Sequence, residues 1–235
     1  QFGTFDPSRG GRTLTQREMI NSLKSLSPWS DPEPDVILLY RDDASFRYPT
    51  KQTYYGGTGV LAHLLLAETI AQFNGSNPSY LSGFSNYCIY SAGNLTKVCL
   101  EGFANRLATV ATRQIVDKKW SDGLVAKAIE IFGAPSDATR ADLITFISQV
   151  VALHPRFPYH RYTGTGNPLD GSGKLFKLDE FEIAEKASFA LRGTPPDFAA
   201  LDDAKAGTFV SNFAAHFNRW FYTAVAQPWY GNDRL

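Results

Sequence analysis

The sequence lacks the charge imbalance that several function classes require. Its 23 Lys and Arg residues balance 23 Asp and Glu residues, so the formal net charge is 0. Binding to nucleic acid depends on clustered basic residues that neutralise phosphates, and docking on an anionic membrane depends on the same attraction. A balanced chain without a basic block therefore predicts no nucleic-acid partner and no electrostatic membrane partner.

Long apolar runs are also missing. The longest one, VLAHLLLA at positions 60–67, is interrupted by His63. A membrane-spanning helix needs roughly 20 consecutive apolar residues. The sequence therefore predicts no membrane span.

Motifs for common enzyme chemistry are absent as well. The sequence contains no GxSxG elbow, no Walker A loop, no HExxH pair and no GxGxxG turn after a strand. Neither a nucleophile nor a nucleotide fold is indicated. No motif identifies a cofactor, so the cofactor is unknown, and a metal or a haem stays open.

Cysteine is scarce, and its two positions point to a compartment. Cys88 and Cys99 have no CxxC spacing and no nearby histidine cluster, so we expect a disulfide between them rather than a zinc site. Two sequons predict N-glycosylation at Asn74 and Asn94. The chain begins with Gln1, as expected after removal of a signal peptide. Together these features predict a secreted, extracellular glycoprotein.

Helical periodicity dominates what the sequence does contain. Apolar residues recur every three to four positions, with few strand signals. We expect helices after capping boxes at 15–18 and 179–182, over 59–73, 100–120 and 204–226, and from 121 and from 136 onward. The sequence predicts a mainly α, single-domain, irregular helical bundle over residues 1–235 with long loops. The alternative is an α+β fold with a small hairpin near the cysteine pair.

A polar stripe crosses the last predicted helix. Asn212, His216, Arg219 and Thr223 follow helical spacing, and aromatic residues flank them: Phe209, Phe213, Phe217, Trp220 and Phe221. Buried polar groups need partners. The stripe is therefore either a network that fixes the helix to its neighbours or a pocket wall, with His216 as base or ligand and Arg219 as anion binder.

The segment HPRFPYHRY, at positions 154–162, contains two histidines, two arginines and two tyrosines together with two prolines. A cationic His154 suits a helix end, which explains that residue without a function. The prolines favour an extended chain, which would place Arg156 and His160 on one side and Tyr159 on the other. We expect Arg156, Tyr159 and Asn212 to bind substrate in a site whose catalytic residues are His160, His216 and Arg219.

Three short segments are similar, in order, to segments of fungal haem-thiolate peroxidases and peroxygenases: GRTLT at 11–15, DASF at 43–46 and FPYH at 157–160. Those proteins are helical and secreted. They hold haem through a cysteine in a Pro-Cys-Pro motif near the N-terminus, and an acidic residue precedes a His-Asp pair in their middle segment. Here no cysteine precedes Cys88, and the middle segment reads Tyr40-Arg41-Asp42-Asp43. The resemblance therefore does not extend to these functional residues, and we infer no membership.

Two functions remain open from the sequence. The first is a secreted interaction or effector-type protein that binds a host or cell-wall component, with an extracellular protein or polysaccharide as partner. Aromatic and arginine residues are the usual anchors of such surfaces. The alternative is an extracellular enzyme with a histidine-centred pocket, either a hydrolase or a metal- or haem-dependent oxidoreductase of peroxidase type. Convergence of His160, His216 and Arg219 in one pocket would favour the enzyme.

Overall fold

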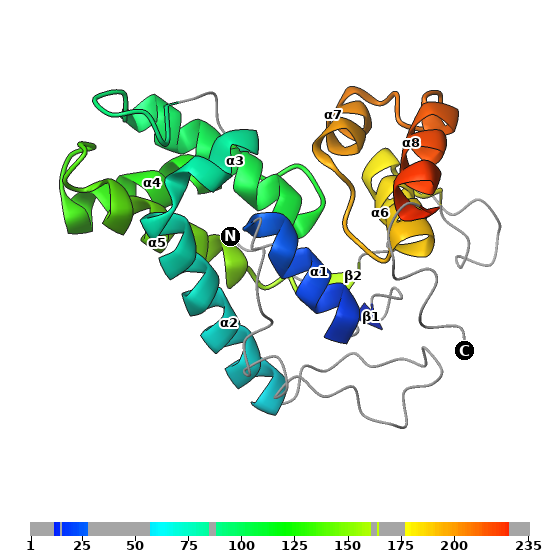
Figure 1. Ribbon diagram of the computed structural model, residues 1–235, viewed down its shortest axis with the longest axis horizontal. Helices are drawn as coiled ribbons and strands as arrows, with labels where there is room; N and C mark the ends of the chain where they lie inside the picture. Colours follow the sequence, from blue (N-terminus) through cyan, green and yellow to red (C-terminus); the bar gives the residue numbers. More distant parts are fainter. Residues whose placement is uncertain are drawn as a thin grey trace.

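The computed structural model describes residues 12–14, 16–27, 57–84, 88–160, 164 and 177–225. It is mainly α, which confirms the predicted fold class (Figure 1). The elements are β1 (Arg12–Thr13), α1 (Gln16–Leu26), α2 (Gly57–Ser76), the 3₁₀ helix η4 (Pro78–Gly83), α3 (Lys97–Thr112), α4 (Lys118–Phe132), α5 (Arg140–Ala152), β2 (Tyr159–His160), α6 (Glu180–Arg192), α7 (Phe198–Ala206) and α8 (Phe213–Val225).

Helix α6 shows how local sequence sets its own boundaries. The Asp179 carboxylate accepts a hydrogen bond from the Glu182 backbone N–H at 2.8 Å, and the Glu182 carboxylate accepts one from the Asp179 N–H at 3.0 Å. This reciprocal pair is the predicted capping box. The helix ends at Gly193, whose φ of 66° lies in the left-handed region that glycine adopts without strain.

Several predicted helix boundaries are wrong. The helix expected from Ser136 begins at Arg140. The helix expected over 100–120 ends at Thr112, before the left-handed residue Arg113. Helix α4 begins three residues before Ser121, at Lys118, where the Asp117 side chain accepts a hydrogen bond from the Lys119 N–H at 2.9 Å. The helix expected over 204–226 is two helices, because the backbone turns left-handed at Gly207. Between α3 and α4, and between α7 and α8, the spacing of apolar residues continues past the end of the helix. A local signal, the Asp117 cap in one place and Gly207 in the other, nevertheless divides the chain into two helices.

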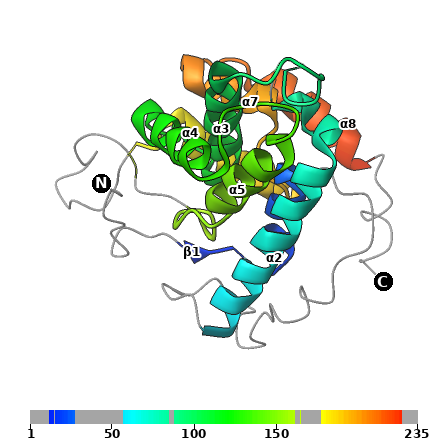
Figure 2. The ribbon, with the colours of Figure 1, turned by 90° about the vertical axis from the view of Figure 1, so that its left-hand side faces the viewer.

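The helices form two groups that share one apolar core. Helices α1 to α5 make the larger group, with α2 lying along α5, and α6 to α8 make the smaller one (Figures 1 and 2). The α2–α5 approach is close at Gly75, where an added Cβ would lie 2.0 Å from Thr145 Oγ1. Helix α3 contacts both α1 and α7, and buried apolar residues run continuously from Leu14 to Trp220.

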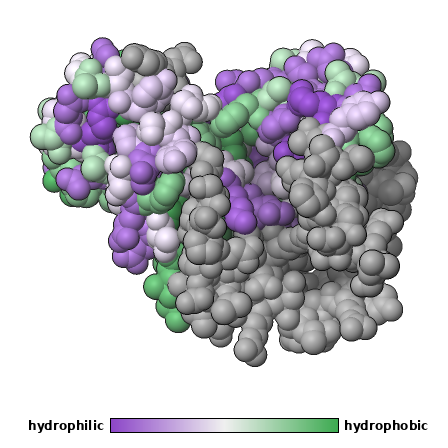
Figure 3. Space-filling view, in the orientation of Figure 1, coloured by the Kyte–Doolittle hydropathy of each residue, from purple (hydrophilic) through white to green (hydrophobic). Residues whose placement is uncertain are grey.

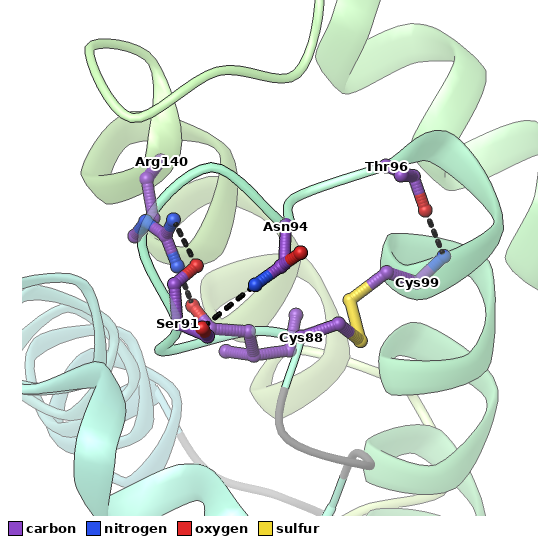
Figure 4. Close-up of a disulfide and its surroundings, with 7 residues drawn as sticks. Cys88, Ser91, Asn94, Thr96, Cys99 and Arg140 are labelled. Carbon is purple, nitrogen blue, oxygen red and sulfur yellow. Dashed lines mark hydrogen bonds between the residues drawn. A yellow bond between two sulfur atoms is a disulfide. The ribbon is translucent and has the colours of Figure 1, made fainter.

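A disulfide joins Cys88 to Cys99, as the sequence predicts (Figure 4). The loop that it closes is also held by Arg140, which donates hydrogen bonds to the carbonyl oxygens of Ile89 and of Ser91. Residues 88–93 are turns, so the hairpin of the alternative fold is not found in the described residues around the pair. The described β pairing lies elsewhere, between β1 and β2, with Arg12 opposite His160.

The two sequons lie in contrasting places. Asn94 is exposed in the disulfide loop, where its Nδ2 donates to Ser91 Oγ at 2.8 Å (Figure 4). Asn74 is fully buried in the last turn of α2, and its Nδ2 donates to Leu26 O and Ser148 Oγ, both at 3.2 Å. A glycan on Asn74 would need α2 to separate from α5, so the glycosylation predicted at Asn74 is incompatible with this fold.

Among the helices that the structure describes, none has the combined length and apolar character needed to cross a bilayer.

Candidate functional site

The segment around His154 is shaped by turns rather than extended. Residues 155–158 form a turn, with the Phe157 N–H donating to His154 O at 2.8 Å. The alternation expected from two prolines is therefore wrong here: Phe157, Pro158 and His160 are all buried. The reason lies in Arg113, whose guanidinium donates to Phe157 O at 3.0 Å and to Tyr159 O at 2.7 Å.

His160 belongs to a buried ionic cluster. Its Nδ1 lies 2.9 Å from Glu185 Oε1 and its Nε2 lies 3.2 Å from Glu18 Oε2, while Phe189 packs edge-on against the ring. The same Glu185 oxygen lies 2.7 Å from Arg113 Nε. His160 has no exposed side-chain area. Helices α1 and α6, strand β2 and the end of α3 therefore meet at one charged cluster inside the protein.

His216 belongs to a different network, which α7 and α8 share. Its Nε2 lies 2.7 Å from Asp203 Oδ2, and its Nδ1 lies 2.9 Å from Arg219 Nη2. A guanidinium only donates, so Nδ1 accepts and the ring proton sits on Nε2, facing the carboxylate. Asn212 donates to the same Asp203 oxygen at 2.9 Å. These hydrogen bonds, that of Asn212 first and that of His216 second, hold the pKa of Asp203 below its usual value.

Arg219 is tied to Asp197, the residue that caps α7. Its Nη2 lies 2.7 and 2.8 Å from the two carboxylate oxygens, and Trp220 Nε1 donates to one of them at 2.8 Å. Burial alone would raise the pKa of Asp197. Hydrogen bonds from Trp220, from the Ala200 N–H and from Arg219 outweigh burial and lower it. Of the two interpretations of the polar stripe, this geometry matches the network that fixes the helix.

The predicted site residues therefore fall into two places. Asn212, His216 and Arg219 come together against α7, as their spacing indicates. His160 lies with Glu18, Glu185 and Phe189, none of which is a described partner of His216.

The three residues predicted to bind substrate also fall into two places: Arg156 and Tyr159 share a turn, in which the Tyr159 N–H donates to Arg156 O at 3.3 Å, and Asn212 directly precedes α8. Tyr159 is half-buried, and its carbonyl oxygen is held by Arg113. Arg156 contributes its backbone N–H to His154 Nδ1 at 3.2 Å. Asn212 is exposed and bound to Asp203.

The remaining histidines are structural. His63 Nε2 lies 2.6 Å from Ala152 O, its ring stacks on Phe157, and burial lowers its pKa. His154 packs edge-on against Trp120; burial first, and the nearby Arg156 second, lower its pKa to about 4. Both rings are therefore neutral at pH 7. The expectation that His154 is cationic at the helix end is wrong.

The partners of these histidines had weak signals in the sequence. Asp197 follows Pro195-Pro196 and precedes a helix, which is a recognisable N-cap position. Arg113, Glu185 and Asp203 look like ordinary charged helix residues. Only the tertiary structure shows that Glu185 contacts His160, that Asp203 contacts His216, and that Arg113 pairs with Glu185.

An aromatic row is the main exposed feature of α8. Phe213, Phe217 and Phe221 recur every four residues and are 37%, 36% and 48% exposed, and we call these three residues the aromatic ridge. Phe209 and Trp220, two of the aromatic residues that flank the polar stripe, are buried instead. Tyr222, whose ring packs edge-on against Phe221, is 72% exposed. Apolar side chains of this kind appear as green patches over α8 in Figure 3.

No group of three or more His, Cys, Asp or Glu residues in the described part of the chain is arranged to hold a metal ion. Comparison of the chain with models of protein families, with curated proteins and with solved structures finds no match.

Proposed function

We propose that this chain is a secreted binding protein whose aromatic ridge on α8 contacts a component of a cell wall or of another extracellular surface. The observation that supports the proposal is the contrast along α8. His216 of the polar stripe is buried and bonded to Asp203, and Arg219 is bonded to Asp197, whereas the three phenylalanines of the ridge are exposed.

Exposed aromatic side chains of this kind are unusual on a protein that has no partner. A solvent-facing phenylalanine loses the free energy that its burial would release, about 25 cal/mol per Å² of apolar surface. Contiguous apolar patches of a few hundred Å² often mark binding sites. The ridge is also anchored, because Trp220 and His216, on the neighbouring face of the helix, bond to Asp197 and Asp203.

The enzyme alternative receives less support from this geometry. A general base needs a lone pair that can reach substrate. Both ring nitrogens of His216 have partners within the protein, and both nitrogens of His160 face carboxylates. Arg219 is engaged by Asp197. No specific observation favours the hydrolase or the peroxidase-type oxidoreductase over binding.

A cosedimentation experiment tests the proposal. Isolated cell walls, and separately intact cells, are incubated with 1 µM wild-type protein or with the double variant Phe217→Ser, Phe221→Ser, and the pelleted fraction is measured. The matched control is Val98→Ser, which changes a 76% exposed valine on α3. We expect the wild type and the control to pellet together and the ridge variant to stay in solution. Equal partition of all three would refute the proposal.

A further inference from the structure

We propose that Ser27, Asn74 and Ser148 form an internal binding site for one water molecule, which joins helices α1, α2 and α5. The site lies inside the larger group of helices, so the inference does not depend on the proposed function. The three helices pack on one another (Figures 1 and 2). Ser27 directly follows α1, Asn74 lies in the last turn of α2, and Ser148 belongs to α5.

The amide of Asn74 fixes the orientation of the site. Its Nδ2 donates to Leu26 O and to Ser148 Oγ, both at 3.2 Å, which uses both protons of the amide nitrogen. Leu26 O is one of the carbonyl oxygens that the end of α1 leaves without a partner inside the helix. The amide cannot be turned over, because Oδ1 would then face Leu26 O and two acceptors would meet.

The oxygen of the same amide has no partner in the protein. Asn74 is fully buried, and its Oδ1 neither receives a hydrogen bond nor reaches bulk solvent. An amide oxygen can accept two hydrogen bonds, and a buried one that accepts none destabilises the fold. About 90% or more of buried polar groups are paired, either within the protein or with an ordered water molecule. Asn74 Oδ1 therefore needs a donor that the protein does not supply.

Two buried hydroxyl groups near this amide are also incompletely paired. Ser27 Oγ is fully buried and has no hydrogen-bond partner. Ser148 is 1% exposed and accepts a hydrogen bond from Asn74, but no hydrogen bond among the described residues uses its own proton. Ser148 touches the amide directly, and Ser27 follows the residue whose carbonyl oxygen the amide binds. Neither hydroxyl group donates to Asn74 Oδ1.

A water molecule has the donors and the acceptors that these groups lack. It would donate one proton to Asn74 Oδ1 and the other to Ser27 Oγ, and it would accept the proton of the Ser148 hydroxyl group. Three hydrogen bonds are the usual number for a buried water molecule. All three side chains are uncharged, so a neutral ligand suits them.

The packing around the site is close enough to retain the water. Gly75 follows Asn74, and a Cβ added there would lie 2.0 Å from Thr145 Oγ1 and 2.7 Å from Ala141 O, so α2 and α5 are in direct contact beside the site. The water could leave only if helices separated. We therefore expect it to stay bound for longer than the protein takes to rotate in solution.

Oxygen-17 magnetic relaxation dispersion of the full chain tests the inference, because this method counts water molecules that exchange more slowly than the protein rotates. The double variant Ser27→Ala, Ser148→Ala keeps the bond from Asn74 to Leu26 but removes two of the three water contacts. We expect its dispersion to fall by the amount that one water molecule contributes. The control Ser188→Ala, which removes a buried hydroxyl group bonded to Thr194 O at 2.9 Å, should leave the dispersion unchanged. Equal dispersions for wild type and double variant would overturn the inference.

Urea unfolding of the single variant Ser27→Ala gives a second test. A buried hydroxyl group without a partner is unfavourable, so its removal would leave the unfolding constant unchanged or lower it. If the hydroxyl group binds the water, its removal should raise that constant about fivefold, as expected for Ser188→Ala. An unchanged or lower constant would contradict the water site. A raised constant with no loss of bound water would also contradict it, because Ser27 would then bond to the protein itself.

Discussion

Arg113 and Glu185 form an ion pair inside the protein, with 2.7 Å between Nε and Oε1 and with side chains only 1% and 3% exposed. Arg113 caps α3 and Glu185 lies on α6, so the pair connects the larger group of helices to the smaller one. Arg113 also has a φ of 55°, a left-handed conformation that disfavours a side chain. The contacts of its guanidinium offset that local strain.

Removing the Glu185 carboxylate should strongly destabilise the fold. Glu185→Gln leaves the Arg113 guanidinium buried without its counter-ion, and such losses typically reduce the free energy of unfolding by about 3–5 kcal/mol. Urea unfolding followed by circular dichroism measures the change. The control is Asp202→Asn, which breaks the exposed pair with Arg106 and should cost less than about 1 kcal/mol. Equal losses for the two variants would contradict the assigned role.

Glycine-to-alanine changes should destabilise the protein where the glycine is tightly packed and stabilise it where the glycine faces open space. At Gly75 a new Cβ would lie 2.0 Å from Thr145 Oγ1 and 2.7 Å from Ala141 O, so Gly75→Ala should force α2 away from α5 and lower the melting temperature. At Gly102 and Gly123 the same atom meets nothing within 4 Å. Alanine there should stabilise its helix by about 0.8–1 kcal/mol. Differential scanning calorimetry of the three variants checks both signs.

Stability should fall as the pH drops from about 6.5 toward 4. The pKa of His154 is lowered to about 4 in the fold, whereas the unfolded chain takes up that proton near 6.5. Between these values unfolding binds a proton, so the folded state loses up to about 1.4 kcal/mol for each pH unit of acidification. His63, whose pKa is also lowered, acts in the same direction.

The variant His154→Gln isolates this contribution. Its free energy of unfolding, measured by urea titration at several pH values between 4.5 and 6.5, should vary less with pH than that of the wild type. His63 is still present in this variant, and its pKa is also lowered in the fold, so the free energy of unfolding should still vary with pH to some extent. An unchanged slope would mean that His154 is protonated in the folded protein.

Glycosylation should occupy one sequon and not the other. When the chain is expressed with a signal peptide in a eukaryotic host, we expect sugar on Asn94, which is exposed, and none on Asn74, which is buried. Peptide mass spectrometry after deglycosylation identifies the site. Asn94→Gln should then give an unglycosylated protein of unchanged fold, and sugar on Asn74 would disprove the packing of α2 on α5.

Loss of the disulfide should weaken the fold without unfolding it. Cys88 and Cys99 are 11 residues apart, and closing a loop of that length stabilises a protein by about 3 kcal/mol in the chain-entropy estimate. Arg140 holds the same loop through Ile89 O and Ser91 O, so the double Cys→Ser variant should keep its helical content. Circular dichroism and a thermal scan measure both effects. Two free thiols in the unreduced wild type would exclude the disulfide and remove the main support for secretion.

Local features of the sequence determined most of the helices. The capping box at Asp179 and Glu182 and the stop at Gly193 define α6 through hydrogen bonds between near neighbours, which any tertiary structure would retain. The pairing of the two cysteines followed from their number. The polar stripe of Asn212, His216 and Arg219 was visible because helical spacing is itself a local property.

What each of those residues contacts was decided only by the tertiary structure. His160 meets Glu185 and Arg113 because α3, β2 and α6 converge, and nothing in the spacing of these residues records that convergence. The two sequons are equivalent as motifs, yet the packing of α2 on α5 buries Asn74 while the disulfide loop exposes Asn94. Side-chain spacing along one helix is fixed by the backbone, whereas burial and partners depend on how separate helices pack. For that reason the sequence indicated the phenylalanines of α8, and only the packed structure showed which of them face solvent.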